Sequence, residues 1–84
     1  MYRYHYIKLR SYILLMEIIY TNHALYSMKN RKIEKVWVEE AIKSPDLLEK
    51  EPEKYYARKK LNGLSIEVVF EKKKYIKVIT VYWV

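Results

Sequence analysis

The sequence from residue 54 to residue 84, KYYARKKLNGLSIEVVFEKKKYIKVITVYWV, decides the fold. Its Asn62-Gly63 dipeptide separates two runs in which apolar and polar residues alternate. A two-residue hairpin of type I′ needs positive φ at both central positions, and Asn-Gly adopts this conformation readily. We therefore predict two antiparallel strands with a turn at Asn62-Gly63, and a third strand from Tyr75 after the lysines of residues 72–74.

This turn fixes how the first two strands pair. It places Tyr55 opposite Phe70 and Ala57 opposite Val68, on the face that we expect to cover the core. The other face is a mixed polar surface, of the kind that a one-sided antiparallel sheet shows to solvent or to a ligand. Its residues are Tyr56, Arg58, Lys60, Ser65, Glu67, Val69 and Glu71.

The preceding part of the chain predicts one strand and two helices. A short β-rich run, residues 16–20, leads into Thr21-Asn22, which are both good helix N-cap residues. The first helix ends near residues 30–32, and the second covers residues 33–43 and stops before Pro45. Residues 46–53 read as a charged connector. The apolar positions expected to face the sheet are Ala24, Leu25 and Met28 in the first helix and Ile33, Val36, Trp37, Ala41 and Ile42 in the second.

The predicted fold class is α+β, in the order strand, helix, helix, strand, strand, strand. Two helices pack on one antiparallel sheet, and the first strand lies beside the last to complete four strands. This is the layout of the RelE/ParE-type toxin nucleases and gyrase inhibitors. We expect residues 16–84 to form a single domain, and residues 1–15 to be an N-terminal extension that is either disordered or adds an element.

Composition narrows the classes of partner. A formal net charge of +7 and a pI near 9.5 favour a polyanion, although lysine also serves simply to keep a small protein soluble. Without cysteine there is no disulfide, zinc ribbon or thiol nucleophile, so we expect a reducing cytoplasm. The apolar run of residues 12–20 contains Glu17 and is too short to span a bilayer, so no membrane role is expected. Abundant Lys, Glu and Ile without Gln is typical of a thermophile.

An ordered set of short motifs resembles a widespread prokaryotic family, domain of unknown function 4258, over about residues 16–84. The motifs are Tyr20-Thr21-Asn22-His23-Ala24, Met28, Arg31-Lys32-Ile33, Val38, Ala41-Ile42, Ser44-Pro45-Asp46 and the closing Ile79-Thr80-Val81-Tyr82. This resemblance implies a RelE/ParE-like fold and, by association, a toxin of a toxin–antitoxin pair. It supplies no catalytic residues.

Metal-free RNA cleavage needs a base for the 2′-hydroxyl, an acid for the leaving 5′-oxygen, and cations where negative charge grows on the phosphorane. His23 is the natural acid or base near neutral pH, with a turn-fixing structural histidine as the alternative. Arg31 is suited to bind a phosphate with two hydrogen bonds, but it is equally placed to cap the first helix.

A cationic strip is predicted on the polar face of the sheet. Arg58 and Lys60 belong to it, with Lys77 joining if the lysine turn uses three residues. Tyr56 and Tyr82 flank the strip and offer rings for base stacking. The alternative is that Arg58 forms a plain cross-strand ion pair with Glu67.

These residues lead to the hypothesis of a toxin-like, metal-independent endoribonuclease with His23 and Arg58 as catalytic residues. Lys60, Lys77, Arg31, Tyr56 and Tyr82 are predicted to bind RNA. The expected partners are RNA or the ribosome and a cognate antitoxin; no metal and no small-molecule cofactor is expected. The alternatives are a non-catalytic nucleic-acid-binding or gyrase-directed inhibitor module, and a small protein-interaction domain.

Overall fold

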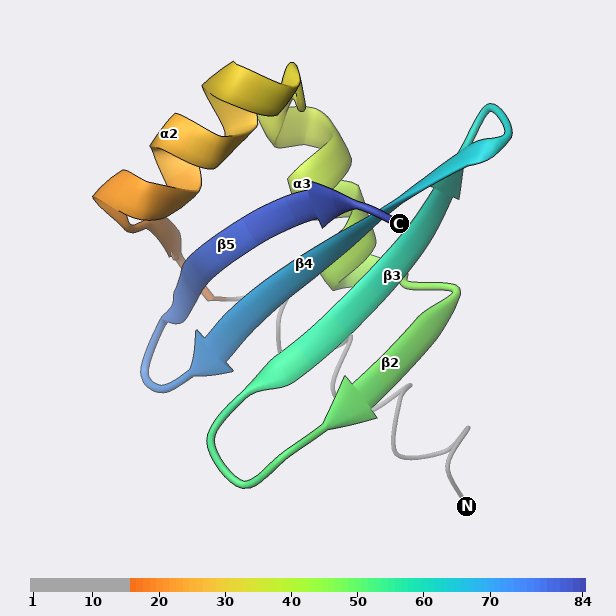
Figure 1. The fold of residues 1–84 in the computed structure, drawn as a ribbon. Coiled ribbons are helices and arrows are strands. Elements are labelled where there is room, and N and C mark those ends of the chain that lie inside the picture. Colours follow the sequence, from red (N-terminus) through yellow and green to blue (C-terminus); the bar gives the residue numbers. More distant parts are fainter. Residues whose placement is uncertain (1–15) are drawn as a thin grey trace.

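The computed structural model describes residues 16–84, so the expectation for residues 1–15 lies outside the described part (Figure 1). Two helices and five strands follow one another along the chain. They are β1 (Ile18–Tyr20), α2 (Asn22–Arg31), α3 (Lys35–Lys43), β2 (Leu47–Lys50), β3 (Tyr55–Leu61), β4 (Leu64–Lys72) and β5 (Ile76–Trp83). Within residues 16–84 no helix is long and apolar enough to cross a membrane.

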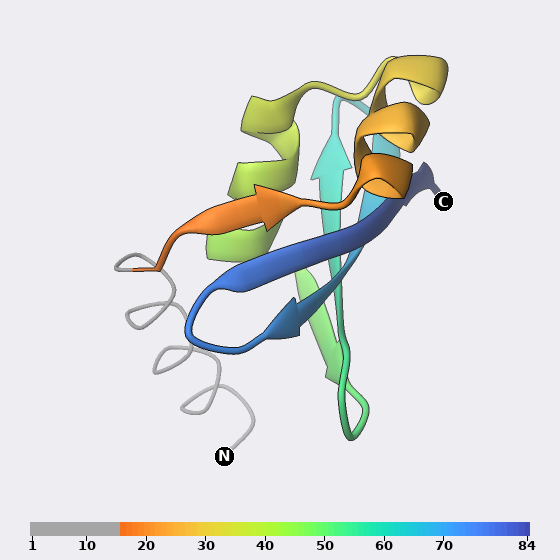
Figure 2. The ribbon, with the colours of Figure 1, turned by 90° about the vertical axis from the view of Figure 1, so that its left-hand side faces the viewer.

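The strands form one sheet in the order β1-β5-β4-β3-β2. The predicted antiparallel sheet is wrong at its first strand, because β1 runs parallel to β5, with Ile18 beside Ile76 and Tyr20 beside Val78 (Figure 2). The position of this strand next to the last one is as predicted, but its direction is not. For a three-residue strand, the sequence indicates only which side chains are apolar. This pattern is the same whether the strand pairs parallel or antiparallel with its neighbour.

The number of strands is also corrected from four to five. The charged connector predicted at residues 46–53 contains β2, which pairs antiparallel with β3 and places Leu48 beside Ala57. Only Leu48 of this strand is buried. Sheets often end in a short edge strand with charged residues, which prevents another chain from pairing with the edge. Such a strand has too little alternation of apolar and polar residues to be recognised from the sequence.

The hairpin is confirmed in position and register. Asn62 and Gly63 have φ of 47° and 87°, as a type I′ turn requires. Tyr55 lies opposite Phe70 and Ala57 opposite Val68, and both pairs face the helices. The Phe70 side chain is completely buried, and its ring stacks on that of Tyr55 with centroids 5.2 Å apart.

The two helices cover one face of the sheet, and α3 lies behind β3 and β4 in Figure 1. The predicted core positions Leu25 and Val36 are wrong, because they are 42% and 60% exposed. The buried side chains of α2 are Ala24, Ser27 and Met28, and those of α3 are Val38, Ala41 and Ile42. Ala24 and Met28 are buried as predicted, whereas the polar Ser27 was not expected in the core. The small side chains of Ala24 and Ser27 let the backbone of α2 approach the sheet closely.

One residue of β5 breaks the regular pairing with β4. Phe70 pairs with Val78 but the preceding Val69 pairs with Thr80, so Ile79 is a β-bulge without a partner on β4. The carbonyl of Ile79 accepts a hydrogen bond of 3.0 Å from the hydroxyl of Thr21. That same hydroxyl accepts from the Ala24 N–H at 3.0 Å and so caps α2. Thr21 therefore joins the start of the helix to the bulge.

This double role predicts the effect of substituting Thr21. Thr21→Val keeps the shape of the side chain but removes both hydrogen bonds, so we expect a loss of about 2 kcal/mol in the free energy of unfolding. Thr21→Ser keeps the hydroxyl and should lose about 0.5 kcal/mol or less. Urea denaturation followed by circular dichroism measures both variants. Equal stability of the two variants would show that the hydroxyl does not hold this junction.

Candidate nucleic-acid interface

The face of the sheet that the helices leave uncovered carries the side chains that alternate with the core residues. We call it the open face (Figures 1 and 2). Its residues on β3, β4 and β5 are Tyr56, Arg58, Lys60, Ser65, Glu67, Val69, Glu71, Lys77, Thr80 and Tyr82. No helix within residues 16–84 packs on this side. The predicted polar face of the hairpin is therefore correctly assigned.

Arg58, Glu67 and Tyr82 form a row across three adjacent strands, because the register places Glu67 between the other two. The Arg58 guanidinium donates from Nε and Nη2 to Glu67 Oε1, at 3.2 and 2.9 Å. The Tyr82 hydroxyl donates to the second carboxylate oxygen, Oε2, at 2.5 Å. The predicted alternative for Arg58, a cross-strand ion pair, is thus present. One carboxylate collects three hydrogen bonds on this face.

The two tyrosines of the open face both remain protonated at neutral pH. The hydrogen bond to Glu67, aided by partial burial, raises the pKa of Tyr82 to about 12. The Tyr56 hydroxyl donates to Glu51 Oε1 at 3.1 Å, and this hydrogen bond raises the pKa of Tyr56. Both phenols are therefore neutral donors attached to rings at the surface, and neither is a base.

The two predicted lysines of the strip lie at opposite ends of the open face. Lys60 follows Arg58 on β3, two residues along the same face, and its backbone N–H donates to the Asp46 carboxylate at 2.8 Å. Lys77 lies opposite Glu71 near the turn between β4 and β5, five residues from Tyr82. At about 3.3 Å per residue this is a separation of roughly 16 Å along the strand. Lys60 belongs with Arg58, whereas Lys77 does not.

His23 is not brought to Arg58. It lies in the first turn of α2, a helix whose Ala24 and Met28 belong to the core on the covered face of the sheet. The side chain of His23 is exposed, and its Nε2 is 3.4 Å from the hydroxyl of buried Ser27. The predicted pairing of His23 and Arg58 in one cleft therefore has no geometric basis, and a catalytic role for His23 alone stays a prediction.

Arg31 is the last residue of α2 and is exposed. Its carbonyl accepts a hydrogen bond of 3.0 Å from the Trp83 indole, which ties the helix end to β5. The helix is capped instead by Lys32, which has φ of 58° and whose N–H bonds to carbonyls of the last turn. In the described part of the chain the Arg31 guanidinium has no hydrogen-bond or ion-pair partner. Its proposed phosphate contact stays a prediction.

With this geometry established, comparison with known proteins gives one result. Residues 20–83 match a family described as Domain of unknown function (DUF4258). The chain belongs to the DUF4258 family. Comparison with curated proteins and with solved structures gave no match. The family resemblance found in the sequence is therefore confirmed, but the further likeness to RelE/ParE-type toxins is not confirmed.

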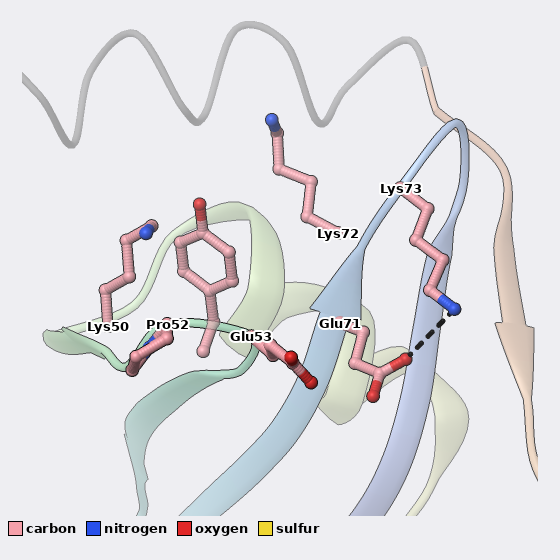
Figure 3. Close-up of a pocket in the computed structure, with 7 residues that line it drawn as sticks. Lys50, Pro52, Glu53, Glu71, Lys72 and Lys73 are labelled. Atoms are coloured by element: carbon pink, nitrogen blue, oxygen red, sulfur yellow. Dashed lines mark ion pairs between the residues drawn. The ribbon is translucent and has the colours of Figure 1, made fainter.

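This DUF4258 domain also has a cleft at one end of the sheet, with a volume of about 510 Å³. It lies between the turn after β2 and the turn after β4, and its charged lining residues come from both sides (Figure 3). Lys73 makes an ion pair of 3.4 Å with Glu71 there. The lining residues are Lys50, Pro52, Glu53, Tyr55, Glu71, Lys72 and Lys73. Three lysines and two glutamates line this cleft, so it does not present one sign of charge.

No metal centre is found among the residues that the structure describes, since no three His, Asp or Glu side chains gather there. The open face offers the side chains of Arg58, Glu67 and Tyr82, which are joined by hydrogen bonds. Sequence reasoning identified Arg58 and Tyr82 but treated Glu67 only as an ion-pair partner. The sequence did not indicate the bulge at Ile79, and it is this bulge that places Tyr82 opposite Glu67.

The hydrogen bond between Tyr82 and Glu67 predicts that the Tyr82 hydroxyl loses its proton at an unusually high pH. The difference in phenolate absorbance between wild type and Tyr82→Phe should show a midpoint of about 12 instead of the ordinary value near 10. Because the pKa is raised in the folded state, its contribution to stability is complete below about pH 10 and is lost as the pH rises through about 12.

The matched comparison uses Glu67→Gln, in which the charged acceptor is gone. The midpoint of Tyr82, measured against the Glu67→Gln/Tyr82→Phe double variant, should then fall toward 10. A midpoint near 10 already in the wild type would show that the Tyr82–Glu67 hydrogen bond does not persist in solution.

Proposed function

We propose that the protein binds single-stranded RNA on the open face of its sheet. The observation that carries this proposal is the placement of Arg58 and Lys60 on the same side of β3, with Tyr56 two residues before Arg58 on that strand and Tyr82 level with Arg58 on β5. Proteins that bind single strands combine cations that contact phosphates with aromatic rings on which bases stack. Both components are present on one accessible surface.

Charge supports the choice of an anionic partner. The chain carries a net charge of +7. Arg58 is the cation whose position is best defined, since its guanidinium is oriented by two hydrogen bonds and 45% of its side chain is exposed. A planar guanidinium suits phosphate oxygens well because it offers several donors in one plane.

The tyrosines support a nucleic acid in place of an acidic protein. Tyr56 and Tyr82 are partly exposed, and their hydroxyls are anchored by Glu51 and Glu67. Anchoring restricts the rings before a ligand arrives, so less side-chain entropy is lost on stacking. Neutral phenols also avoid repulsion from phosphates. This surface is therefore suited to bases that are splayed out from a single strand.

A second candidate function, metal-independent cleavage of the bound RNA, is favoured by one further observation. A carboxylate and a protonated phenol meet beside the proposed phosphate-binding residue, as Glu67, Tyr82 and Arg58. Glu67 would accept the proton of the 2′-hydroxyl, Tyr82 would donate a proton to the leaving 5′-oxygen, and Arg58 would stabilise the negative charge on the phosphorane oxygens. This assignment keeps Arg58 of the original hypothesis and replaces His23.

The binding proposal predicts the effect of removing Arg58. Arg58→Ala should weaken the binding of a fluorescein-labelled, unstructured 12-nucleotide RNA by about three- to tenfold. It should also lower the slope of log affinity against log salt by about 0.7, the value for one phosphate contact to a single strand. Fluorescence anisotropy over a range of salt concentrations measures both quantities.

Arg31→Ala provides the matched control, because it removes the same charge from the end of α2. We expect it to change the affinity by less than about twofold, because Arg31 lies at the end of a helix that packs on the covered face of the sheet. Equal losses for the two variants would mean that the RNA binds through overall charge and not through the open face.

The cleavage candidate predicts losses of rate with retained binding. Glu67→Gln and Tyr82→Phe should each slow RNA cleavage by about 10²- to 10⁴-fold if the row supplies the base and the acid. Gel electrophoresis of labelled RNA, with a chelator present, measures the rate. Intact RNA with the wild-type protein, on free RNA and on translating ribosomes, leaves binding as the function.

His23→Ala separates the two catalytic hypotheses. We expect it to leave the cleavage rate within about twofold of the wild type, since His23 lies on the covered side of the sheet. A large loss for His23→Ala with normal rates for Glu67→Gln would place the chemistry at α2 and return the catalytic role to the histidine.

A further inference from the structure

Glu67 occupies the donors that a phosphate would use. Its two carboxylate oxygens accept both hydrogen bonds of the Arg58 guanidinium and the hydrogen bond of the Tyr82 hydroxyl. A phosphodiester also offers two non-bridging oxygens with a shared negative charge, so it matches the same donors. The free protein therefore carries an acceptor of its own in the position where a ligand would bind.

We propose that Glu67 is an internal competitor for the RNA phosphate, and that a phosphodiester binds by displacing its carboxylate from Arg58. This inference rests on the proposed binding of RNA to the open face and adds its regulation. The exchange forms and breaks no covalent bond. The guanidinium passes from one oxyanion to another, and the carboxylate moves to water.

The exposure of the two partners makes such an exchange feasible. The side chain of Arg58 is 45% exposed, whereas that of Glu67 is only 13% exposed. A phosphate can therefore approach Arg58 from solvent without first moving the carboxylate. An ion pair of this exposure contributes only a small free energy, so breaking it costs a ligand little.

Tyr82 keeps the competitor in position. Its hydroxyl holds the carboxylate oxygen that Arg58 does not use, and its strand lies on the other side of β4. Glu67 is thereby held from both neighbouring strands and its carboxylate cannot rotate freely away from Arg58. Because of this competition, the apparent affinity for RNA is the intrinsic affinity multiplied by the fraction of molecules in which Arg58 is already released from Glu67.

The consequence is selectivity for the ligand that brings more than one contact. Inorganic phosphate makes one contact, with Arg58, and the free energy of this contact is offset by the loss of the Arg58–Glu67 ion pair. It therefore binds weakly. A strand that also stacks on Tyr56 and contacts Lys60 supplies additional free energy and completes the exchange. The internal carboxylate therefore lowers the affinity of every ligand that needs Arg58, and a ligand with further contacts, such as RNA, still binds when a small anion does not.

The decisive experiment is a double-mutant cycle between Glu67 and Arg58, read as affinity for the labelled 12-nucleotide RNA. Glu67→Gln should bind about three- to tenfold more tightly than the wild type, because the amide competes less well for the guanidinium. The gain should disappear when Arg58→Ala is already present, since the competed group is then absent. Inorganic phosphate should displace RNA from Glu67→Gln at lower concentrations than from the wild type.

Glu49→Gln is the matched control for the change in net charge. Glu49 lies opposite Tyr56 on the neighbouring edge strand, is exposed and makes no ion pair within residues 16–84. We expect its affinity to change by less than about twofold. An equal gain in Glu49→Gln and Glu67→Gln would overturn the proposal in favour of general electrostatics.

Thermal melts establish that each variant is folded, and Glu67→Asp provides a test without a change of charge. Its carboxylate is one methylene shorter and should hold Arg58 less well, so RNA should bind more tightly than to the wild type. Wild-type binding that Arg58→Ala weakens, together with no gain in Glu67→Gln or Glu67→Asp, overturns the competitor alone. Absence of RNA binding in the wild type and in every variant overturns the proposed function, and the competitor with it.

Discussion

The arrangement of the open face depends on one extra residue in β5. If the regular pairing of Phe70 with Val78 continued along β5, Tyr82 would lie opposite the buried Ile66 and its side chain would face the core. The bulge at Ile79 moves the register by one and places Val81 in the core and Tyr82 opposite Glu67. Lys77 and Tyr82 differ in parity along the strand, and only a bulge allows both to share one face. The hydrogen bonds of Glu67 follow from this irregularity.

The bulge is in turn held by the helix that precedes the sheet. The Thr21 N–H donates to the Val78 carbonyl and the Thr21 hydroxyl donates to the Ile79 carbonyl, so both peptide groups at the irregular point have partners. The same hydroxyl fixes the first turn of α2. Small side chains on that helix then let it settle against β5. The covered face of the sheet thus fixes the geometry of the face that we propose to bind RNA, although no residue of the helix reaches it.

The parts of this structure that the sequence predicts are those fixed by local chemistry. Asn62-Gly63 determines a turn, and the turn determines the register of β3 and β4. This register places Ala57 on the covered face of the sheet and Arg58 on the open face. The direction of β1, the existence of β2 and the partner of Tyr82 depend instead on residues far apart in the chain. Leu25 shows the same limit, since a helix packed through Ala24 and Ser27 leaves its larger apolar residue exposed. For the candidate site, residue types were predictable but their grouping was not, which is why His23 was paired with Arg58.

The hydrogen bond from Thr21 to Ile79 spans 58 positions in the chain, and β1 can pair only with the strand that comes last among those described. Contacts of such long separation form late and slow the folding of a domain. During translation, the first strand and helix must wait for β5 to leave the ribosome before either finds its place. Until then Tyr82 is not aligned with Glu67, and the open face does not exist as a surface. A protein that we propose to bind RNA is thereby synthesised beside abundant RNA in a form that has no assembled site.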